Sequence, residues 1–254
     1  MAKEKINAKI VRQEQIGSDI YSMVLKVGEL AKDVVAGQFI SMYCHEGSRL
    51  LPRPISICEV NKEEQTLRVV YRVVGNGTKE FSTLTAGESI EILAPLGNGF
   101  TVKEKKAILI GGGIGIPPML ELAKSMKTRP TVVLGYRNEL FLNQEFEPYA
   151  DVVIATEDGS TGTKGTVLDA IKENQLTGEI IYACGPTPML KAISEYAIEK
   201  GIEAQVSLEE RMACGIGACL ACVCKSKEKD HHTNVNNKRI CKDGPVFEAR
   251  EIDW

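Results

Sequence analysis

Short runs of alternating or continuous apolar residues fill the first hundred positions of the chain. Turn-forming residues separate these runs, and residues 77–84 form the one stretch in this part that suggests a helix. Several short strands at regular spacing are typical of a β-barrel. We therefore predict a barrel domain over residues 1–102. Its expected strands lie at residues 8–13, 20–27, 37–44, 67–74 and 89–97.

The pattern changes from about residue 105 onward. Short, wholly apolar runs are expected for strands buried on both faces of a parallel sheet, and here they alternate with helical segments. We predict an α/β parallel-sheet domain over residues 103–206 and a small C-terminal module over residues 207–254. The expected strands lie at residues 107–110, 131–137, 151–156, 179–184 and 204–208, and helices begin near Pro117, Thr166 and Pro188.

Composition narrows the class of protein. Of the 254 residues, 43% are hydrophobic and 26% are charged, which is ordinary for a globular protein. A net charge of −3 does not suggest a nucleic-acid or membrane surface, and no apolar run approaches the length of a membrane span. The first residues lack the apolar core of a signal peptide, so the eight cysteines favour a reducing compartment over a disulfide framework. We expect a cytoplasmic protein.

Three of the cysteines follow one another closely near the C-terminus. Cys214, Cys219 and Cys222 have the spacing C-x4-C-x2-C, and Cys241 follows in a later segment. Plant-type 2Fe–2S clusters use this spacing, because each of the two irons needs two thiolates. Glycines inside the loop let the backbone fold closely around such a cluster. We predict that these four cysteines ligate a 2Fe–2S cluster.

Two alternatives concern the same thiols. A zinc site usually takes two C-x2-C-like pairs, which this spacing does not provide. Cys224 is an alternative to Cys241, but it is very close to Cys222, and alternation in an extended chain would point both the same way. The polar segment 225–238 is expected to be an exposed loop or hairpin tip, in which His231 and His232 are solvated.

Two glycine-rich turns follow predicted parallel strands. Residues 111–115 read Gly-Gly-Gly-Ile-Gly, and residues 184–186 read Cys-Gly-Pro. Parallel sheets bind ligands at the carboxyl ends of their strands, where glycine lets a phosphate approach the backbone. A strict G-x-G-x-x-G is absent, so the usual dinucleotide fingerprint does not apply. The two turns together predict a nucleotide site.

The barrel region contains two further motifs. Arg53-Pro-Ile-Ser56 offers a guanidinium fork for a phosphate and a hydroxyl for a polar ring edge. Gly75-Asn-Gly77-Thr78 leads into the predicted helix and could bind an anion through its backbone N–H groups. Taken alone, the first motif also fits an edge strand with a solvated arginine, and the second fits an ordinary turn.

Taken in order, residues 53–56, 111–115 and 184–186 resemble the three main signatures of the ferredoxin–NADP reductase superfamily. The resemblance implies an FAD-binding β-barrel followed by an NAD-binding domain. The cysteine loop and Cys241-Lys-Asp-Gly-Pro are similar to the module of dihydroorotate dehydrogenase B electron-transfer subunits. The resemblance implies FAD contacts from Arg53, Pro54, Ile55, Ser56, Val70, Tyr71, Arg72, Gly77 and Thr78, NAD contacts from Gly111, Gly112, Gly113, Gly115, Cys184, Gly185 and Pro186, and cluster ligation by Cys214, Cys219, Cys222 and Cys241.

This resemblance also implies a reaction and a partner. An FMN-containing catalytic subunit oxidises dihydroorotate in pyrimidine biosynthesis, and single electrons pass through the 2Fe–2S cluster to FAD, which reduces NAD+ by hydride transfer. The implied assembly is a heterotetramer of two catalytic and two electron-transfer subunits. No catalytic acid, base or nucleophile is expected in this chain. Arg137 follows the second parallel strand and leaves NADP open as the alternative nucleotide, and Trp254 either packs at the subunit interface or caps the C-terminal module.

Three other functions compete with this one. The small subunit of an NADH-dependent ferredoxin:NADP oxidoreductase, or of a sulfide dehydrogenase, has similar modules, but residues 220–224 and 242–247 favour the dihydroorotate family. A non-enzymatic redox sensor needs no hydride pathway, so the flavin and nicotinamide motifs count against it. A zinc-stabilised binding module is the third, and it would be colourless.

Overall fold

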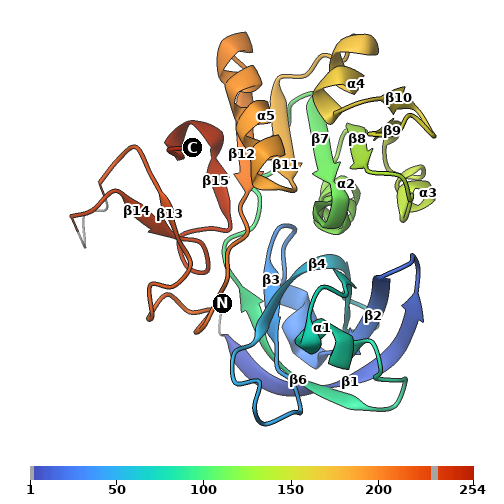
Figure 1. Cartoon of the computed structure of the whole chain (residues 1–254), viewed down its shortest axis with the longest axis vertical. Helices are drawn as coiled ribbons and strands as arrows, with labels where there is room; N and C mark the ends of the chain where they lie inside the picture. The colour runs from blue at the N-terminus through green and yellow to red at the C-terminus, as the bar shows by residue number, and fades with distance from the viewer. Residues whose placement is uncertain (1–2, 230–233) are drawn as a thin grey trace.

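The computed structural model describes residues 3–229 and 234–254. A closed barrel lies at one end, a sheet with helices on both faces lies at the other, and the C-terminal module lies beside them (Figure 1). This arrangement confirms the predicted fold class. None of the helices in the described part of the chain is long and apolar enough to cross a membrane.

Six antiparallel strands form the barrel in the order β1-β2-β5-β4-β3-β6. Alternation places Ile40 and Met42 of β3 in the barrel interior, with Ile57 of β4 and Tyr71 of β5. Phe39 and Ser41 therefore point outward. The elements are β1 (Glu4–Gln15), β2 (Ile20–Lys26), η1 (Gly28–Asp33), β3 (Phe39–Met42), β4 (Arg53–Asn61), β5 (Thr66–Arg72), α1 (Asn76–Phe81) and β6 (Ser89–Leu96).

Strand β4 was expected only as the alternative interpretation of the Arg53–Ser56 motif, an edge strand, and not among the predicted barrel strands. Its first residues are Arg53 and Pro54, and a proline within a run argues against a paired strand because it has no N–H to donate. In the structure Pro54 pairs with Ser41 close to the beginning of β4, where a missing donor is tolerated. The Arg53–Ser56 motif is thus part of the barrel wall.

The second sheet has seven strands in the order β10-β9-β8-β7-β11-β12-β15, all parallel except β15. The predicted parallel sheet is therefore confirmed. The elements are β7 (Ala107–Gly112), η2 (Gly113–Gly115), α2 (Pro117–Ser125), β8 (Thr131–Tyr136), α3 (Asn143–Phe146), β9 (Asp151–Thr156), β10 (Thr163–Lys164), α4 (Val167–Glu173), β11 (Ile180–Cys184), α5 (Thr187–Lys200) and β12 (Glu203–Ser207).

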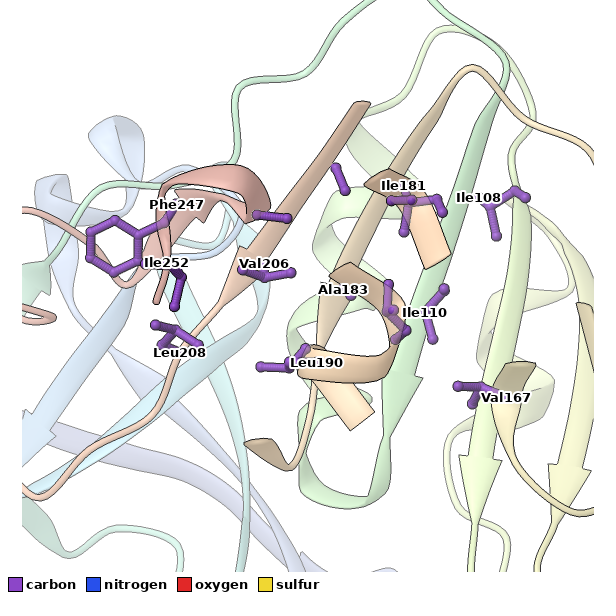
Figure 2. Packing of buried hydrophobic residues seen from close by; sticks show 14 of the residues in the cluster. Ile108, Ile110, Val167, Ile181, Ala183, Leu190, Val206, Leu208, Phe247 and Ile252 are labelled. Carbon is purple, nitrogen blue, oxygen red and sulfur yellow. The ribbon is translucent and has the colours of Figure 1, made fainter. Parts of the chain in front are cut away.

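Successive residues of these strands face opposite sides of the sheet. On β7, Ile108 and Ile110 pack with residues of α4 and α5, whereas Leu109 packs with residues of α2 and α3. Figure 2 shows the side of the sheet covered by α4 and α5, where Ile108, Ile110 and Val206 lie along the strands beneath the helices. Helix α2 also contacts strand β4, so it lies between the sheet and the barrel.

The C-terminal module leaves the sheet after β12 and returns to it. A hairpin of β13 (Val223–Lys225) and β14 (Asn237–Arg239) confirms the expected hairpin in the polar segment, while His231 and His232 lie outside the described residues. Strand β15 (Val246–Glu248) then pairs antiparallel with β12, and η3 (Ala249–Glu251) follows. The sheet therefore extends beyond the range 103–206, because its edge strand comes from the last residues.

Candidate functional site

The cysteine loop brings four thiols together in two pairs. Cys214 interacts with the side chain of Cys219, and Cys241 with that of Cys222, so the two members of each pair lie close together. The described residues hold no group of three or more His, Cys, Asp or Glu side chains around one ion position. Two thiolates for each of two irons is the ligand set of a 2Fe–2S cluster, so the pairs fit that group.

Backbone donors surround one of these sulfurs. The N–H groups of Ala218 and Cys219 lie 3.3 and 3.4 Å from Cys214 Sγ. Burial acts to raise the pKa of Cys214, but N–H groups of Ile216, Cys219 and Ala218 and the Cys219 thiol lower it to about 6. Such donors stabilise a thiolate and the sulfurs of a bound cluster.

Two glycines shape the loop. Gly215 and Gly217 have φ values of +66° and +86°, which favour glycine. A Cβ on Gly217 would fall 2.6 Å from Lys242 Cδ, so the loop lies tightly against the residue after Cys241. Gly215 faces the barrel, where its Cβ position is 3.1 Å from Ser41 Oγ.

Cys224 has a different environment from the paired cysteines. Its Sγ donates across the hairpin to the carbonyl of Lys238 at 3.6 Å. Burial raises the pKa of Cys224 to about 11. Cys222, by contrast, is buried in the core cluster beside Cys241. The thiol of Cys224 is thus engaged with the hairpin rather than with Cys241.

The Arg53–Ser56 motif and the Gly77 turn meet on the barrel. A Cβ on Gly77 would lie 2.2 Å from Arg53 Nε, so only glycine allows the guanidinium this position. The Thr78 hydroxyl donates to Gly75 O and accepts from Val74 and Gly75 N–H. That hydroxyl stabilises the turn, and the Thr78 carbonyl accepts from Ser82 N–H at 3.1 Å, so a ligand contact from the Thr78 backbone would come from its N–H.

The other predicted flavin residues divide between the two sides of the barrel wall. Pro54 and Ser56 pair with Ser41 and Phe39 and share their outward face, whereas Ile55 packs against the interior cluster. Ile55 therefore has only its backbone to offer a ligand outside the barrel.

The same alternation applies to β5. Tyr71 lies inside the barrel, where its hydroxyl donates to Gln13 Oε1 at 3.1 Å. Val70 packs outward against the cluster shared with the second sheet. Arg72 Nε is buried and lies 3.3 Å from Asp19 Oδ1, yet it has no hydrogen-bond partner among the described residues. Arg72 thus has Asp19 as a charge partner, and its Nε–H, which lacks a well-formed hydrogen bond, fits an anionic or polar ligand such as FAD.

The two glycine-rich turns lie against each other at the carboxyl ends of β7 and β11. Gly111 is in register with Cys184, and a Cβ on Gly115 would fall 2.4 Å from Cys184 O. A Cβ on Gly112 or on Gly185 would lie 2.4 Å from atoms of the same methionine, Met189 of α5. Gly113 (φ +52°) and Pro186 complete the two turns. The predicted nucleotide residues are thus brought together, and this glycine cradle fits a dinucleotide.

Some residues at these sites were not predicted from sequence. Met189 covers both glycine turns, and Ser41 faces the cysteine loop. Ser41 is remote in sequence from the cysteine loop, whereas Met189 follows the Cys184–Pro186 turn by three residues and is remote only from residues 111–115. One signal was available for Ser41, because it is a hydroxyl within the apolar run Phe39–Met42.

Comparisons with known proteins match this geometry. Residues 209–253 match the iron-sulfur cluster binding domain of dihydroorotate dehydrogenase B, and residues 109–195 match the oxidoreductase NAD-binding domain. Among solved structures, the NADH-dependent reduced ferredoxin-NADP oxidoreductase is 31% identical with a TM-score of 0.88, over 98% of this chain and 90% of that chain. The ferredoxin reductase in carbazole 1,9a-dioxygenase is 20% identical with a TM-score of 0.68, over 80% and 67%, and shows the fold alone.

Curated relatives match nearly the full length. The dihydroorotate dehydrogenase B (NAD(+)) electron transfer subunit of Caldanaerobacter subterraneus subsp. tengcongensis is 42% identical over 250 residues, 98% of each chain. The subunits of the same name from Fusobacterium nucleatum and Streptococcus mutans are each 43% identical, covering 94% and 98% of this chain and 95% and 98% of theirs. The chain therefore belongs to the family of dihydroorotate dehydrogenase B (NAD(+)) electron transfer subunits.

Proposed function

We propose that this chain carries electrons from a dihydroorotate-oxidising, FMN-containing subunit through a 2Fe–2S cluster and FAD to NAD+. One observation carries the proposal: the cysteine loop lies directly on the barrel strand next to the flavin motif. Gly215 faces Ser41 and Leu96, and Ser41 is paired with Pro54 of that motif. Neighbouring strands are about 4.8 Å apart, so one strand separates the two cofactor motifs.

Each group has its own residues in this proposal. The cluster is ligated by Cys214, Cys219, Cys222 and Cys241. FAD is bound by Arg53, Pro54, Ile55, Ser56, Val70, Tyr71, Arg72, Gly77 and Thr78, with Ile55 and Tyr71 acting through their backbones. NAD is bound by Gly111, Gly112, Gly113, Gly115, Cys184, Gly185 and Pro186. The corresponding domains are residues 1–102, 103–206 and 207–254, with β15 added to the nucleotide sheet.

The chain's contribution is to position these groups. A flavin, when bound, exchanges single electrons with an iron–sulfur centre and hydride with a nicotinamide. Arg53 beside Gly77 supplies charge for a pyrophosphate, and the outward face of β4 supplies the Ser56 hydroxyl for the flavin ring. Met189 and the glycine cradle limit the space in which a nicotinamide can lie.

The surface of the cysteine loop suits a partner subunit. Ile216 and Leu220 are 46% and 53% exposed, and Cys219 between them is exposed as well. Apolar side chains beside an electron-transfer centre are expected to be covered in a complex. We place the catalytic subunit there, in a heterotetramer of two catalytic and two electron-transfer subunits. The eight free thiols fit a cytoplasmic setting.

The preference for NAD over NADP has support near Arg137. This exposed residue follows β8, and its carbonyl accepts from Asp158 N–H at 3.4 Å. Glu157 and Asp158, both exposed, thus bring two carboxylates close to Arg137 at the end of β8. Carboxylates at this edge favour a ribose hydroxyl over a 2′-phosphate.

Visible absorption of the co-purified complex tests the proposal. We expect flavin bands with a broad iron–sulfur shoulder, and anaerobic dihydroorotate should bleach both. A complex bleached by NADH or NADPH but not by dihydroorotate would contradict the proposal.

That second outcome would favour another function. The likeness to the NADH-dependent reduced ferredoxin-NADP oxidoreductase, at 31% identity, supports a small subunit of such an enzyme as the second candidate. Its partner would contain other redox centres.

A further inference from the structure

Ser41 is a buried hydroxyl between the flavin motif and the cysteine loop. It points away from the barrel interior, since Ile40 and Met42 on either side point inward. Its exposed fraction is 0%, and across the described ranges no group provides a hydrogen-bond partner for its Oγ. A buried hydroxyl without a partner costs free energy, so such a group in a native protein requires an explanation.

The surroundings of Ser41 limit which acceptor can serve. Opposite it on β4 is Pro54, which has no N–H, and opposite it on β6 is Leu93. Above it lies the backbone of Gly215, whose Cβ position is 3.1 Å from Ser41 Oγ and 3.3 Å from Leu96 Cδ1. The hydroxyl thus lies in an otherwise apolar contact, directly below the residue that follows Cys214.

Resting on the proposed function, we propose that Ser41 Oγ donates a hydrogen bond to a sulfur of the 2Fe–2S cluster and thereby raises the cluster's reduction potential. The reduced cluster carries one more negative charge than the oxidised cluster. A donor near its sulfurs therefore stabilises the reduced form more. Ser41 is a tuning residue that acts on the cluster from the barrel side.

A cluster sulfur is favoured over the flavin as the acceptor. The close contact of Ser41 Oγ is with the loop that contains Cys214 and Cys219. On the flavin side, the neighbouring strand already offers Ser56, which shares the outward face with Ser41. The backbone N–H groups of Ala218 and Cys219 approach Cys214 Sγ from within the loop, so Ser41 would add a donor from the opposite direction.

The test is a redox titration of the complex with Ser41→Ala, followed by EPR of the reduced cluster and by flavin absorbance. We expect the ratio of reduced to oxidised cluster at a fixed potential to fall about tenfold, which corresponds to about 59 mV for a one-electron couple. The flavin potential should stay unchanged. Ser41→Thr, which keeps the hydroxyl, should titrate close to wild type.

Ser194→Ala is the matched control. Ser194 is also buried, but its hydroxyl already donates to Leu190 O at 2.7 Å within α5, so the cluster potential should not move. An unchanged cluster potential in Ser41→Ala, or a shift of the flavin potential instead, would overturn this inference alone. A wild-type complex without a 2Fe–2S EPR signal would overturn the proposed function and this inference together.

Discussion

The barrel contacts the nucleotide sheet through charged side chains as well as through the apolar cluster that includes Val70. Arg68 of β5, 8% exposed, forms ion pairs with Glu145 of α3 and Glu59 of β4, and Lys124 of α2 pairs with Glu59. The Arg68 guanidinium also donates to Ser22 Oγ at 2.8 Å. We call these contacts the charged interface.

The barrel contacts the C-terminal module by close packing of backbone. Asn98 N–H donates to Gly244 O at 2.7 Å. A Cβ on Gly97 would fall 2.4 Å from Pro245 Cδ, and a Cβ on Gly215 would fall 3.1 Å from Ser41 Oγ. We call these contacts the packed interface.

The difference between the two interfaces fits what the proposed function requires of each: nucleotide exchange beside the charged interface and electron transfer across the packed interface. In the proposed function NAD+ binds and leaves at the glycine turns of the sheet, and long charged side chains can keep their pairing while domains shift slightly. Electron transfer between the proposed cluster and the flavin requires a short and constant separation. The close glycine contacts of the packed interface leave little room for the two segments to shift. The charged interface thus suits nucleotide exchange, and the packed interface suits a fixed distance between the two redox centres.

We expect the largest effect from removing a cluster ligand, which should impair only the function that depends on the C-terminal module. Cys219→Ser should abolish dihydroorotate-driven reduction of NAD+, because one iron loses a thiolate. NADH oxidation with an artificial acceptor should survive, since it needs only the barrel and the sheet. Cys224→Ser is the matched control and should keep the cluster. Equal loss of both activities in a folded, flavin-loaded Cys219→Ser protein would contradict the proposed order.

The next prediction concerns the packed interface itself. Gly97 has φ +72°, and a side chain there would also meet Gly244 O at 2.9 Å. Gly97→Ala should lower the free energy of unfolding by about 3 kcal/mol, through backbone strain and overpacking. Gly28→Ala, at φ +66° with nothing within 4 Å, should cost about 1 kcal/mol. Urea unfolding measures both, and equal losses would show that the packing adds nothing.

We expect substitutions in the charged interface to lower the free energy of unfolding by less than Gly97→Ala does. Arg68→Met leaves Glu59 and Glu145 without their shared cation, and we expect a loss of about 2 kcal/mol in unfolding free energy, because Glu145 is partly solvated. Arg12→Met is the control, since the Arg12–Glu14 pair is exposed at 3.8 Å, and it should change stability by less than about 0.5 kcal/mol. If Arg68→Met were as silent as Arg12→Met, the charged interface would have no structural role.

The smallest expected effect is a dependence on pH. Hydrogen bonds from Lys103 and Lys105 lower the pKa of Glu203 from 4.5 to about 2. Because the folded pKa is depressed, the contribution of Glu203 is present above pH 4.5 and is lost as pH falls toward 2. Glu203→Gln should flatten the decline in unfolding free energy over that interval. An identical slope in wild type and variant would contradict this assignment.

Sequence patterns predicted most of the fold because burial repeats at a local period. The runs that became β5, β7 and β8 are buried along nearly their whole length, and their apolar residues were visible directly. Strand β15 could not be predicted, because three residues carry no period and their pairing with β12 depends on the path of the whole module. Strand β4 was hidden by Pro54.

The candidate sites divide in the same way. The cysteine spacing predicted the thiols that pair in the structure, because three of the four ligands of such a cluster come from one short loop with a characteristic spacing. The orientation of Tyr71 into the barrel and the position of Ser41 under Gly215 follow from strand register and from the docking of distant segments. Neither is encoded in a local motif.

Strand β15 also closes an edge. Without it, β12 would present a row of free backbone N–H and C=O groups, which is a template for pairing with other chains. By pairing with β12, the module therefore protects the sheet edge from aggregation in addition to binding a cofactor. A chain truncated before Val246 would expose that edge, so the integrity of the last residues is tied to the solubility of the entire sheet.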